Sequence, residues 1–501
     1  FVADFFSHQQ ITHWQQQWQV HGITLRPLPM SFITAINPPA ARTIAPIFDQ
    51  PITYAGLGRA QKLQQLSEAL RAKNADALLV VDNANLAWLL NLRAFAIPFN
   101  PVVPAFALLL YRGKKPTVHV FGDAFPDAMH SATTKNIDQH YLSLHPLNHL
   151  KKFLSQWQKQ TPDKKIAIDD GQGSYRLVNL IKPSARLTCA DPIDLLKAIK
   201  NSIEIKGAIV AHEKDGVALV KFFYWLEKNM VAGGRPSEQE IADKLWHYRQ
   251  TDPDCICPSF ETIPALSAHA ALPHYQTNPH TNRPLTTSDI LLLDSGAHYY
   301  QGTTDITRTL DLMHHGHGAT PPPWYDDFCH HYTLVLQGHL ALARARFPQG
   351  TTGAQLDPLA RAPLWAQGLD YNHGTGHGVG SFLPVHEGPQ YIGKGGSTAI
   401  VPGMITSNEP GYYRPDHYGI RLENLELCQV VAQNNAGEDI LGFTALTLCP
   451  FDLAPLRHHG TSLLPSERDQ LNAYHRRVYD SLAPHLPADE KNWLAEKTQP
   501  L

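Results

Sequence analysis

The chain has 501 residues, more than one ordinary domain holds and enough for two or three. It has 42 Lys and Arg against 45 Asp and Glu, a net charge of -3, so nothing indicates a nucleic-acid partner or binding to acidic lipid. Apolar residues make up 43% of the chain, which is enough to build substantial cores.

The prolines bear on whether the chain spans a membrane, and the cysteines on its redox compartment. The most apolar stretch, residues 94–111, contains Pro98, Pro101 and Pro104, which argue against a membrane helix and for a soluble interior. The six cysteines in a chain of this length do not have the pattern of a disulfide framework. We therefore expect a protein of a reducing compartment, the cytoplasm, with neither a membrane nor a nucleic acid as partner.

The first fifty residues are too few to close a core of their own. We expect a helix over His8–Gln19, a strand over Ile23–Leu28 and then a proline-rich linker. The chain begins with Phe1 rather than Met. We therefore interpret residues 1–50 as the C-terminal remnant of an incomplete N-terminal domain.

Residues 51–197 alternate between helical and extended patterns. Leucines at positions 63, 66 and 70 have the spacing of one helix face. Short apolar runs then follow that have the length of buried strands. This alternation predicts an α/β domain. The strand-like runs are Ala77–Val81, Ala105–Leu110 and Lys165–Ile168.

Two capping boxes predict helix starts in the remaining residues, 198–501. Asn201 is followed three residues later by Glu204, and Ser237 by Glu240, so we expect a long helix and then a second one. Beyond about residue 255 the chain is rich in Gly, Thr and Tyr, which is typical of strands and turns, and an amphipathic helix is expected near the C-terminus. The predicted fold class is therefore mixed α/β (α+β).

Two aspartates follow a buried strand in this third domain. Three leucines precede Asp294 in LLLDSG, and Asp305 follows in GTTDITRT. If a hairpin turn centres on Tyr299 and Tyr300, the two aspartates pair across it and share one face. Two carboxylates so placed repel each other unless a proton or a cation lies between them.

Two further segments combine glycine with histidine or glutamate. In HGTGHGVG the glycines allow a close approach of the backbone and leave His377 accessible. Glu409 precedes a turn in NEPG, and Arg421 and Glu423 alternate with apolar residues, so both should face the same way on a strand. The candidate metal ligands are Asp294, Asp305, His377, Glu409 and Glu423.

Four carboxylates and one imidazole form a ligand set for hard divalent cations. Two such ions would neutralise the four negative charges. The oxygen-rich set suits Mn²⁺ better than a structural zinc, although Co²⁺, Fe²⁺ or Zn²⁺ could occupy it. Two ions about 3.5 Å apart can share a bridging hydroxide and polarise a carbonyl, as in two-metal aminopeptidases.

The combined motifs resemble those of the pita-bread metallopeptidases, which include methionine aminopeptidase, prolidase and aminopeptidase P. They are most similar to the three-domain Xaa-Pro aminopeptidases of the cytosolic eukaryotic type. The similar segments are DSGAHYYQGTTDITRT, HGTGHGVGSF with VHEGP, EPGYY with GIRLEN, AWLLNLR and the final TQP. The resemblance covers nearly the whole chain. It implies a pita-bread catalytic domain over residues 198–501 with a C-terminal helical extension, preceded by a creatinase-N-like α/β domain over 51–197.

The resemblance also implies how the five ligands are shared. Asp294 would bind one metal ion. His377 and Glu409 would bind the other, and Asp305 and Glu423 would bridge both. Glu409 would in addition transfer a proton during the reaction.

Four more residues acquire roles from the same resemblance. His386 and His274 would contact the substrate, and His386 would steady the tetrahedral intermediate. Arg421 would orient a ligand carboxylate. His373 would line the pocket.

Two stretches depart from the family pattern. Before His274 the chain reads PALSAHAA, where the family has a glycine-rich turn. Most of the family's N-terminal domain, which caps the substrate cleft, has no counterpart, because residues 1–50 resemble only its last helix and strand.

These features predict metal-dependent removal of the first residue from peptides with proline in second position. The Xaa-Pro bond is a tertiary amide without the N–H that other peptidases hold, so a dedicated enzyme is expected. One alternative, a prolidase-like Xaa-Pro dipeptidase, shares the metal ligands. Another is a pita-bread module that binds peptide without catalysis, although such modules usually lack some of the ligands. A third is a competent site impaired by the missing cap. The resemblance also implies a homodimer.

Overall fold

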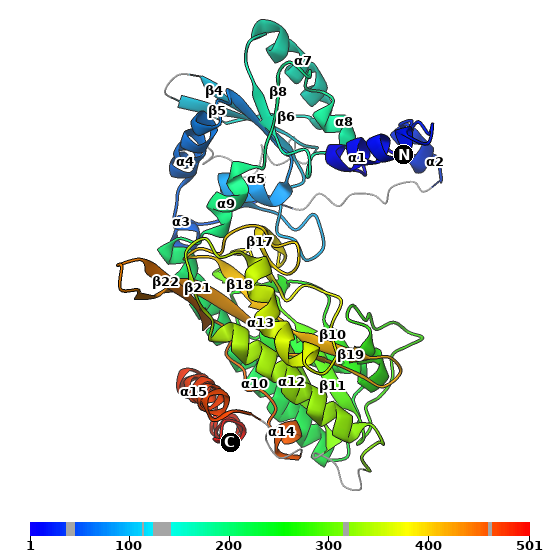
Figure 1. Ribbon diagram of the computed structural model, residues 1–501, viewed down its shortest axis with the longest axis vertical. Coiled ribbons are helices and arrows are strands. Elements are labelled where there is room, and N and C mark those ends of the chain that lie inside the picture. Colours follow the sequence, from blue (N-terminus) through cyan, green and yellow to red (C-terminus); the bar gives the residue numbers. More distant parts are fainter. Residues whose placement is uncertain (37–45, 113–114, 124–141, 314–319, 459–462) are drawn as a thin grey trace. The chain divides into compact units, whose positions relative to one another are not determined.

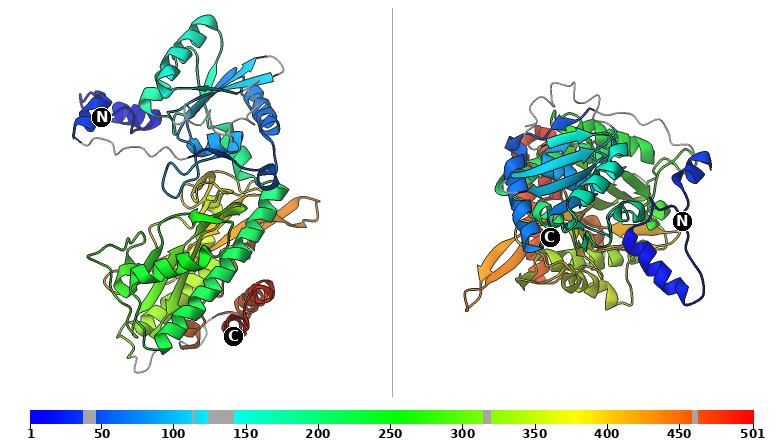
Figure 2. Two further views of the ribbon diagram at one scale, coloured as in Figure 1. Left: turned by 180° about the vertical axis from the view of Figure 1, so that it is seen from behind. Right: turned by 90° about the horizontal axis from the view of Figure 1, so that it is seen from above.

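The computed structural model describes residues 1–36, 46–112, 115–123, 142–313, 320–458 and 463–501. They form two compact units, Phe1–Lys197 and Ala198–Leu501, which Figure 1 and Figure 2 show from three sides. Most of the predicted proline-rich linker, residues 37–45, lies outside the described residues, and the predicted separation of 1–50 from 51–197 stays a prediction. Within the described residues, no helix is both long and apolar enough to cross a bilayer.

The first unit is built around a six-stranded sheet in the order β6-β5-β4-β2-β7-β8. The strand β2 is antiparallel to β4 and parallel to β7, and all four of its residues are buried. Helices α7 and α8 pack apolar side chains against one face of this sheet. The elements of this unit are α1 (His8–Gln19), α2 (Met30–Ile36), β1 (Phe48–Asp49), α3 (Ile52–Ala55), α4 (Arg59–Ala72), β2 (Ala77–Val80), α5 (Asn83–Leu90), β3 (Leu92–Arg93), β4 (Phe106–Arg112), β5 (Lys115–Phe121), β6 (Leu142–His145), η2 (Leu147–His149), α7 (Leu150–Gln160), β7 (Ile166–Ile168), α8 (Tyr175–Val178), β8 (Arg186–Thr188) and α9 (Pro192–Ala198).

The N-terminal segment differs from its prediction in one element. The helix predicted over His8–Gln19 is confirmed as α1, and a capping box formed by Ser7 and Gln10 fixes its start. The strand predicted over Ile23–Leu28 is wrong, because Leu28 forms only an isolated bridge and the rest of the segment has no strand. Residues 23–27 are largely exposed and have no neighbouring strand among the described residues, so their apolar pattern buries nothing.

Helices of the second unit pack against its strands. Both predicted capping boxes are present, at the starts of α10 (Ser202–Val231) and α11 (Glu238–Arg249). The long α10 packs on β11 and β14, whereas α12 (Tyr325–Ala343) packs on β20. The helix predicted near the C-terminus is α15 (Pro465–Leu482), whose buried face packs against α10.

The strands of this unit form several small sheets. Two have three strands, in the orders β10-β11-β14 and β13-β12-β9, and a six-stranded sheet has the order β15-β22-β21-β18-β16-β17. A two-stranded ribbon joins β19 to β20. The remaining elements are β9 (Cys255–Pro258), β10 (Ile263–Leu266), η3 (Ser267–Ala271), β11 (Ile290–Ser295), β12 (Ala297–Tyr299), β13 (Gly302–Thr303), β14 (Ile306–Asp311), β15 (Arg346–Pro348), α13 (Gly353–Trp365), β16 (Gly376–Gly378), β17 (Glu387–Ile392), β18 (Ile405–Asn408), β19 (Gly411–Arg414), β20 (Tyr418–Arg421), β21 (Asn424–Gln433), β22 (Asp439–Ala445), α14 (Ala454–His458), η5 (Ala483–His485) and α16 (Ala488–Lys497).

The predicted pairing of the two aspartates across a hairpin is wrong by two residues. Asp294 in β11 pairs with Thr307 in β14, and Asp305 lies just before β14. The turn follows β12 one position later than expected. At Gly296 the chain passes its partner so closely that a Cβ would lie 2.1 Å from the carbonyl oxygen of Thr304, so a larger residue would not fit there.

A buried arginine ties the C-terminal extension to β14. Arg308 is 1% exposed and donates hydrogen bonds to the backbone carbonyl of Glu423 at 2.5 Å, of Cys449 at 2.7 Å and of Pro450 at 3.1 Å. Its guanidinium also contacts the hydroxyl of Tyr474 in α15 at 3.1 Å. The last helices are therefore bound to the segment that carries Glu423.

Candidate metal centre

One pocket of the second unit brings together all nine site residues predicted from the sequence. Its volume is about 470 Å³. The residues come from four stretches of the chain, at 274, 294–305, 373–386 and 409–423, so the folding of the unit assembles the site. They are Asp294, Asp305, His377, Glu409, Glu423, His274, His373, His386 and Arg421.

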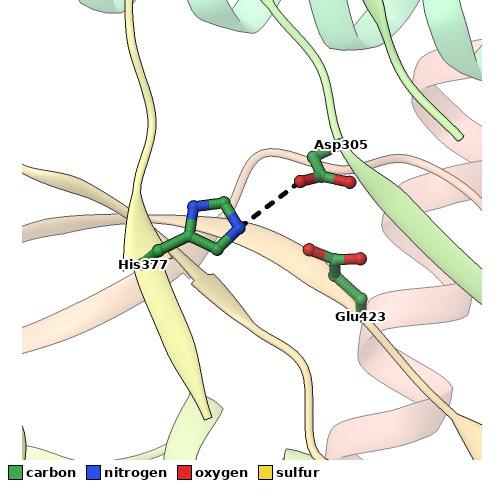
Figure 3. A group of neighbouring side chains, drawn as sticks. All are labelled: Asp305, His377 and Glu423. Carbon is green, nitrogen blue, oxygen red and sulfur yellow. Dashed lines mark ion pairs between the residues drawn. The ribbon is translucent and has the colours of Figure 1, made fainter. Parts of the chain in front are cut away.

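Three of the predicted ligands form a compact group. Asp305, His377 and Glu423 each place one ligand atom so that these atoms lie within 4.8 Å of one another. Figure 3 shows the His377 ring pointing toward the two carboxylates. Its Nε2 atom is 3.5 Å from Asp305 Oδ2 and 3.5 Å from Glu409 Oε1. A single cation could bind between such atoms.

The tautomer of His377 follows from its backbone contact. Its Nδ1 lies 2.9 Å from the carbonyl oxygen of Gly378, and because a carbonyl can only accept, Nδ1 carries the proton. The Nε2 lone pair is then directed toward the carboxylates. This arrangement, with one ring nitrogen held by the backbone, is typical of metal-binding histidines.

Two glycines allow the strand that carries His377 to reach this place. A Cβ on Gly376 would lie 2.0 Å from the carbonyl oxygen of Ser407, and one on Gly378 would lie 2.2 Å from that of Glu387. The short strand β16 therefore lies closer to its neighbours than any side chain at these two positions permits. The glycine-rich motif is explained by this close backbone packing.

Hydrogen bonds orient three of the ligand carboxylates, those of Asp294, Glu423 and Glu409. Arg421 donates to Asp294 Oδ2 at 2.5 Å through Nη2 and to Thr307 Oγ1 at 3.1 Å through Nε. The Thr307 hydroxyl in turn donates a hydrogen bond to Glu423 Oε2 at 2.8 Å. The Ser407 hydroxyl donates to one oxygen of the Glu409 carboxylate at 3.1 Å. Arg421 thus contacts one ligand directly and a second one through a threonine.

Sequence reasoning missed these supporting residues. Thr307 and Ser407 each lie two positions from a ligand along the chain, so strand alternation could have identified both. Tyr413, whose hydroxyl lies 2.9 Å from Arg421 Nη1 and 2.8 Å from His373 Nε2, had no such signal beyond its place in EPGYY.

Burial raises the pKa of three ligand carboxylates, those of Asp305, Glu409 and Glu423. Burial, reinforced by repulsion from Asp294 and Glu409, raises the pKa of Asp305 well above its usual value. Burial and the neighbouring Asp305 do the same to the pKa of Glu423. Burial also raises the pKa of Glu409, although His377 and Arg421 oppose the shift. Without a counter-cation, these groups are forced together at a cost in free energy.

Two histidines of the pocket, His373 and His386, have lowered pKa values. Burial, with the positive charge of Arg421 nearby, lowers the pKa of His373 to about 4. Burial and the neighbouring His377 lower the pKa of His386 to about 4, and the rings of His386 and His377 lie edge to face with centroids 4.3 Å apart. His274 is exposed at the pocket wall. At neutral pH, His373 and His386 are therefore neutral imidazoles, and His373 donates its N–H to the carbonyl oxygen of Gly374.

Three family models match consecutive parts of the chain. Residues 208–429 match metallopeptidase family M24, and residues 439–501 match the C-terminal region of that family. Residues 37–204 match a creatinase/prolidase N-terminal domain.

Curated relatives agree with these matches. The chain is 36% identical to Xaa-Pro aminopeptidase app-1 of Caenorhabditis elegans over 470 residues, which cover 91% of this chain and 73% of the relative. It is 35% identical to Xaa-Pro aminopeptidase 1 of Dictyostelium discoideum over 459 residues, 89% of this chain and 70% of the relative. The chain belongs to metallopeptidase family M24, in its Xaa-Pro aminopeptidase group.

Solved structures of this family show the same fold. An X-prolyl aminopeptidase from Caenorhabditis elegans, described as a cytosolic enzyme with a di-nuclear active site, superimposes with a TM-score of 0.91 and 33% identity over all of this chain and 80% of that one. A prolidase from Pyrococcus horikoshii, at 23% identity and a TM-score of 0.57 over 78% of this chain, shares the fold alone. The predicted fold class, a pita-bread domain after a creatinase-like α/β domain, is confirmed.

The carboxylates of this M24 pocket fit divalent cations. Asp294 Oδ1, Asp305 Oδ1 and Glu423 Oε1 are buried, and none of the described residues forms a hydrogen bond with them. A buried carboxylate oxygen without a partner is costly, and a cation is the partner that removes both this cost and the mutual repulsion. The family's two-metal chemistry is therefore compatible with the residues present.

Proposed function

We propose that this protein is a metal-dependent Xaa-Pro aminopeptidase that removes the first residue from peptides with proline in second position. One observation carries the proposal. Four carboxylates and His377 converge in one pocket, and three of the carboxylates have a buried oxygen that no described residue hydrogen-bonds. Membership of the Xaa-Pro aminopeptidase group supports the choice of substrate.

The five predicted ligands would hold two divalent cations. Asp305 and Glu423 would be shared by both ions, Asp294 would complete one site, and His377 with Glu409 would complete the other. Bound there, the cations would polarise the scissile carbonyl and lower the pKa of the attacking water. We propose Mn²⁺ as the native metal because the ligands are mostly hard oxygens.

In this proposal, Glu409 would move the proton. Its carboxylate lies 3.5 Å from His377 Nε2 and is oriented by Ser407. We propose that Glu409 takes the proton of the attacking water and delivers it to the proline nitrogen as the amide bond breaks. The Xaa-Pro nitrogen has no proton of its own, so this delivery is required to release proline with a secondary amine.

His386 and His274 would serve the other side of the reaction. Both line the pocket, and an N–H donated from either would stabilise the oxyanion of a tetrahedral intermediate. Arg421 would hold Asp294 and, through Thr307, Glu423 in their orientations. Phe260, Ile263 and Tyr391 supply apolar wall against which a proline ring could pack, and His373 would complete the lining.

Two further properties are proposed from the resemblance. A homodimer is typical of the family, and we propose it for this chain. The related nematode enzyme is described as cytosolic, and the free thiols of all six cysteines are compatible with a reducing compartment. We therefore propose a cytoplasmic location.

Hydrolysis of Arg-Pro-Pro compared with Ala-Pro tests the function. With Mn²⁺ present we expect free arginine from the tripeptide, and after chelation we expect none. Cleavage of the dipeptide alone would assign a prolidase instead. Metal binding without cleavage of either peptide would contradict the proposal and favour a peptide-binding role.

A further inference from the structure

A buried glutamate outside the pocket holds the loop that carries His274. Glu238 is the first residue of α11, and its side chain is fully buried at 0% exposure. Its Oε1 accepts hydrogen bonds from the backbone N–H of Leu266 at 3.0 Å and from His269 Nδ1 at 2.7 Å. Its Oε2 accepts a hydrogen bond from the Tyr275 hydroxyl at 2.8 Å. Three donors from one loop thus converge on one carboxylate.

The three donors lie at positions 266, 269 and 275, so the Glu238 carboxylate links the two ends of this loop. Leu266 ends β10, His269 lies within η3, and Tyr275 directly follows His274. The rings of His269 and Tyr275 stack with centroids 4.6 Å apart and planes 20° apart. Tyr275 is buried toward Glu238, whereas His274 is exposed and lines the pocket. Fixing Tyr275 therefore restrains the backbone of its neighbour.

The loop needs such a hold because its backbone starts in an unfavourable conformation. Ser267 has a φ of 47°, in the left-handed region that residues other than glycine rarely adopt. Its hydroxyl donates to Asp289 Oδ1 at 2.6 Å. The loop also packs directly on strand β20, because a Cβ on Gly419 of that strand would lie 1.8 Å from the carbonyl oxygen of Ala270 in the loop. The strand it packs on carries Arg421 at its end.

We propose that Glu238 is a positioning residue for the peptidase reaction, holding residues 267–275 so that His274 faces the metal ligands. The inference rests on the proposed function, because it gives Glu238 a part in that reaction. Glu238 is not among the residues that line the pocket. In place of the glycine-rich turn of the family pattern, this chain has a 3₁₀ turn, and the contact between His269 and Glu238 stabilises it.

A double-mutant cycle tests whether Glu238 acts through His274. Glu238→Gln keeps the shape but turns one acceptor into a donor and removes the charge. We expect Glu238→Gln and His274→Ala each to lower kcat/KM by about ten- to a hundredfold, because small displacements of a reacting group are costly. The double variant should be no worse than His274→Ala alone. Losses that multiply, or wild-type kcat/KM for Glu238→Gln, would overturn the proposal.

Glu467→Gln provides the matched control. Glu467 is also a buried glutamate in the first turn of a helix, 5% exposed, and accepts a backbone hydrogen bond from Leu464 at 3.0 Å. Its loss should lower the melting temperature while kcat/KM stays within about twofold of wild type. An equal loss of kcat/KM in both variants would mean that destabilisation alone explains Glu238→Gln.

Amide hydrogen exchange supplies a readout that needs no activity. In Glu238→Gln, peptides covering residues 267–276 should exchange faster by about tenfold, the effect expected from losing a hydrogen bond to a charged group. In Glu467→Gln the acceleration should instead appear around residues 464–470. If wild type cleaves no Xaa-Pro peptide, the proposed function fails, yet this comparison still tests the hold on the loop. Unchanged exchange at 267–276 would sink the inference.

Discussion

Among the described residues, each of three pocket carboxylates has one oxygen that forms no hydrogen bond. Asp294 contacts Arg421 through Oδ2 and Glu423 contacts Thr307 through Oε2, while Asp294 Oδ1 and Glu423 Oε1 have no such partner. Such a division is what a ligand needs, because a protein donor orients the group and leaves a lone pair for the cation. In the metal-free pocket, the same carboxylates repel one another.

Asp305→Asn separates the binding of the metal from the repulsion between the carboxylates. Removing one negative charge relieves repulsion in the chelated protein, so we expect its melting temperature to rise above that of chelated wild type. The same change removes a ligand, and kcat/KM in excess Mn²⁺ should fall by more than about a hundredfold. Melting curves with and without chelator, together with peptide hydrolysis, check both halves. A variant with wild-type activity would remove Asp305 from the ligand set.

Thr307→Val tests the link from Arg421 to Glu423. Valine keeps the volume but cannot accept from Arg421 Nε or donate to Glu423 Oε2. We expect kcat/KM to fall by about ten- to a hundredfold, with a matching loss of metal affinity, as for other groups that orient ligands. The control is Thr309→Val, two residues along the same strand, which loses only bonds to the backbone of Arg421. Equal effects in the two variants would argue against the link.

At the scale of elements, local signals were predictable and distant contacts were not. The starts of α10 and α11 depend on residues three apart, which are visible in the sequence. The register between β11 and β14 depends on where the turn after β12 lies, and that turn is one position later than the sequence pattern indicates. The strand expected over Ile23–Leu28 failed because a strand also needs a neighbour.

In the candidate site, too, some features could be predicted from the sequence and others could not. Its nine residues were identified by chemical type and by resemblance, and the fold brings them into one pocket. The hold of Glu238 on a loop 28 to 37 residues further along could not be predicted, because hydrogen bonds over such separations follow from tertiary packing. Thr307 and Ser407 lie between these cases, since alternation along a strand marks them once the ligands are known.

Gly376→Ala tests the close packing of β16. A Cβ there would lie 2.0 Å from the carbonyl oxygen of Ser407, so the strand must move and take His377 with it. We expect loss of metal binding and a fall in kcat/KM of about a hundredfold or more. Gly395→Ala is the matched control, because its Cβ would meet nothing within 4 Å. If Gly376→Ala binds metal with wild-type affinity, the glycine is not needed for this packing.

At the scale of the whole molecule, neutral histidines in the core make stability depend on pH. Burial, aided by the positive charge of Arg308, lowers the pKa of His339 and of His475 to about 3. His475 Nε2 accepts the backbone N–H of Phe451 at 3.1 Å, so protonation there would break this bond. A folded-state pKa below the unfolded value means that stability is complete above about pH 6.5 and is lost as the pH falls toward 3.

His475→Gln isolates one such group. A glutamine oxygen can accept the same N–H but does not titrate. We expect the free energy of unfolding of wild type to fall by a few kcal/mol more than that of the variant between about pH 6.5 and pH 3, since one pKa unit is worth about 1.4 kcal/mol. Urea unfolding at several pH values measures the difference. Parallel pH curves for the two proteins would show that His475 is protonated as easily when folded.

The contacts of Arg308 also bear on how the enzyme is made. The carbonyls of Cys449 and Pro450 and the hydroxyl of Tyr474 hold this arginine, and it in turn holds the backbone of Glu423. During synthesis, these three residues leave the ribosome after all the predicted ligands, because the last ligand in the chain is Glu423. A chain still in synthesis thus has every predicted ligand but not the support that fixes one of them. We expect peptidase activity to appear only after residues 449–474 have left the ribosome.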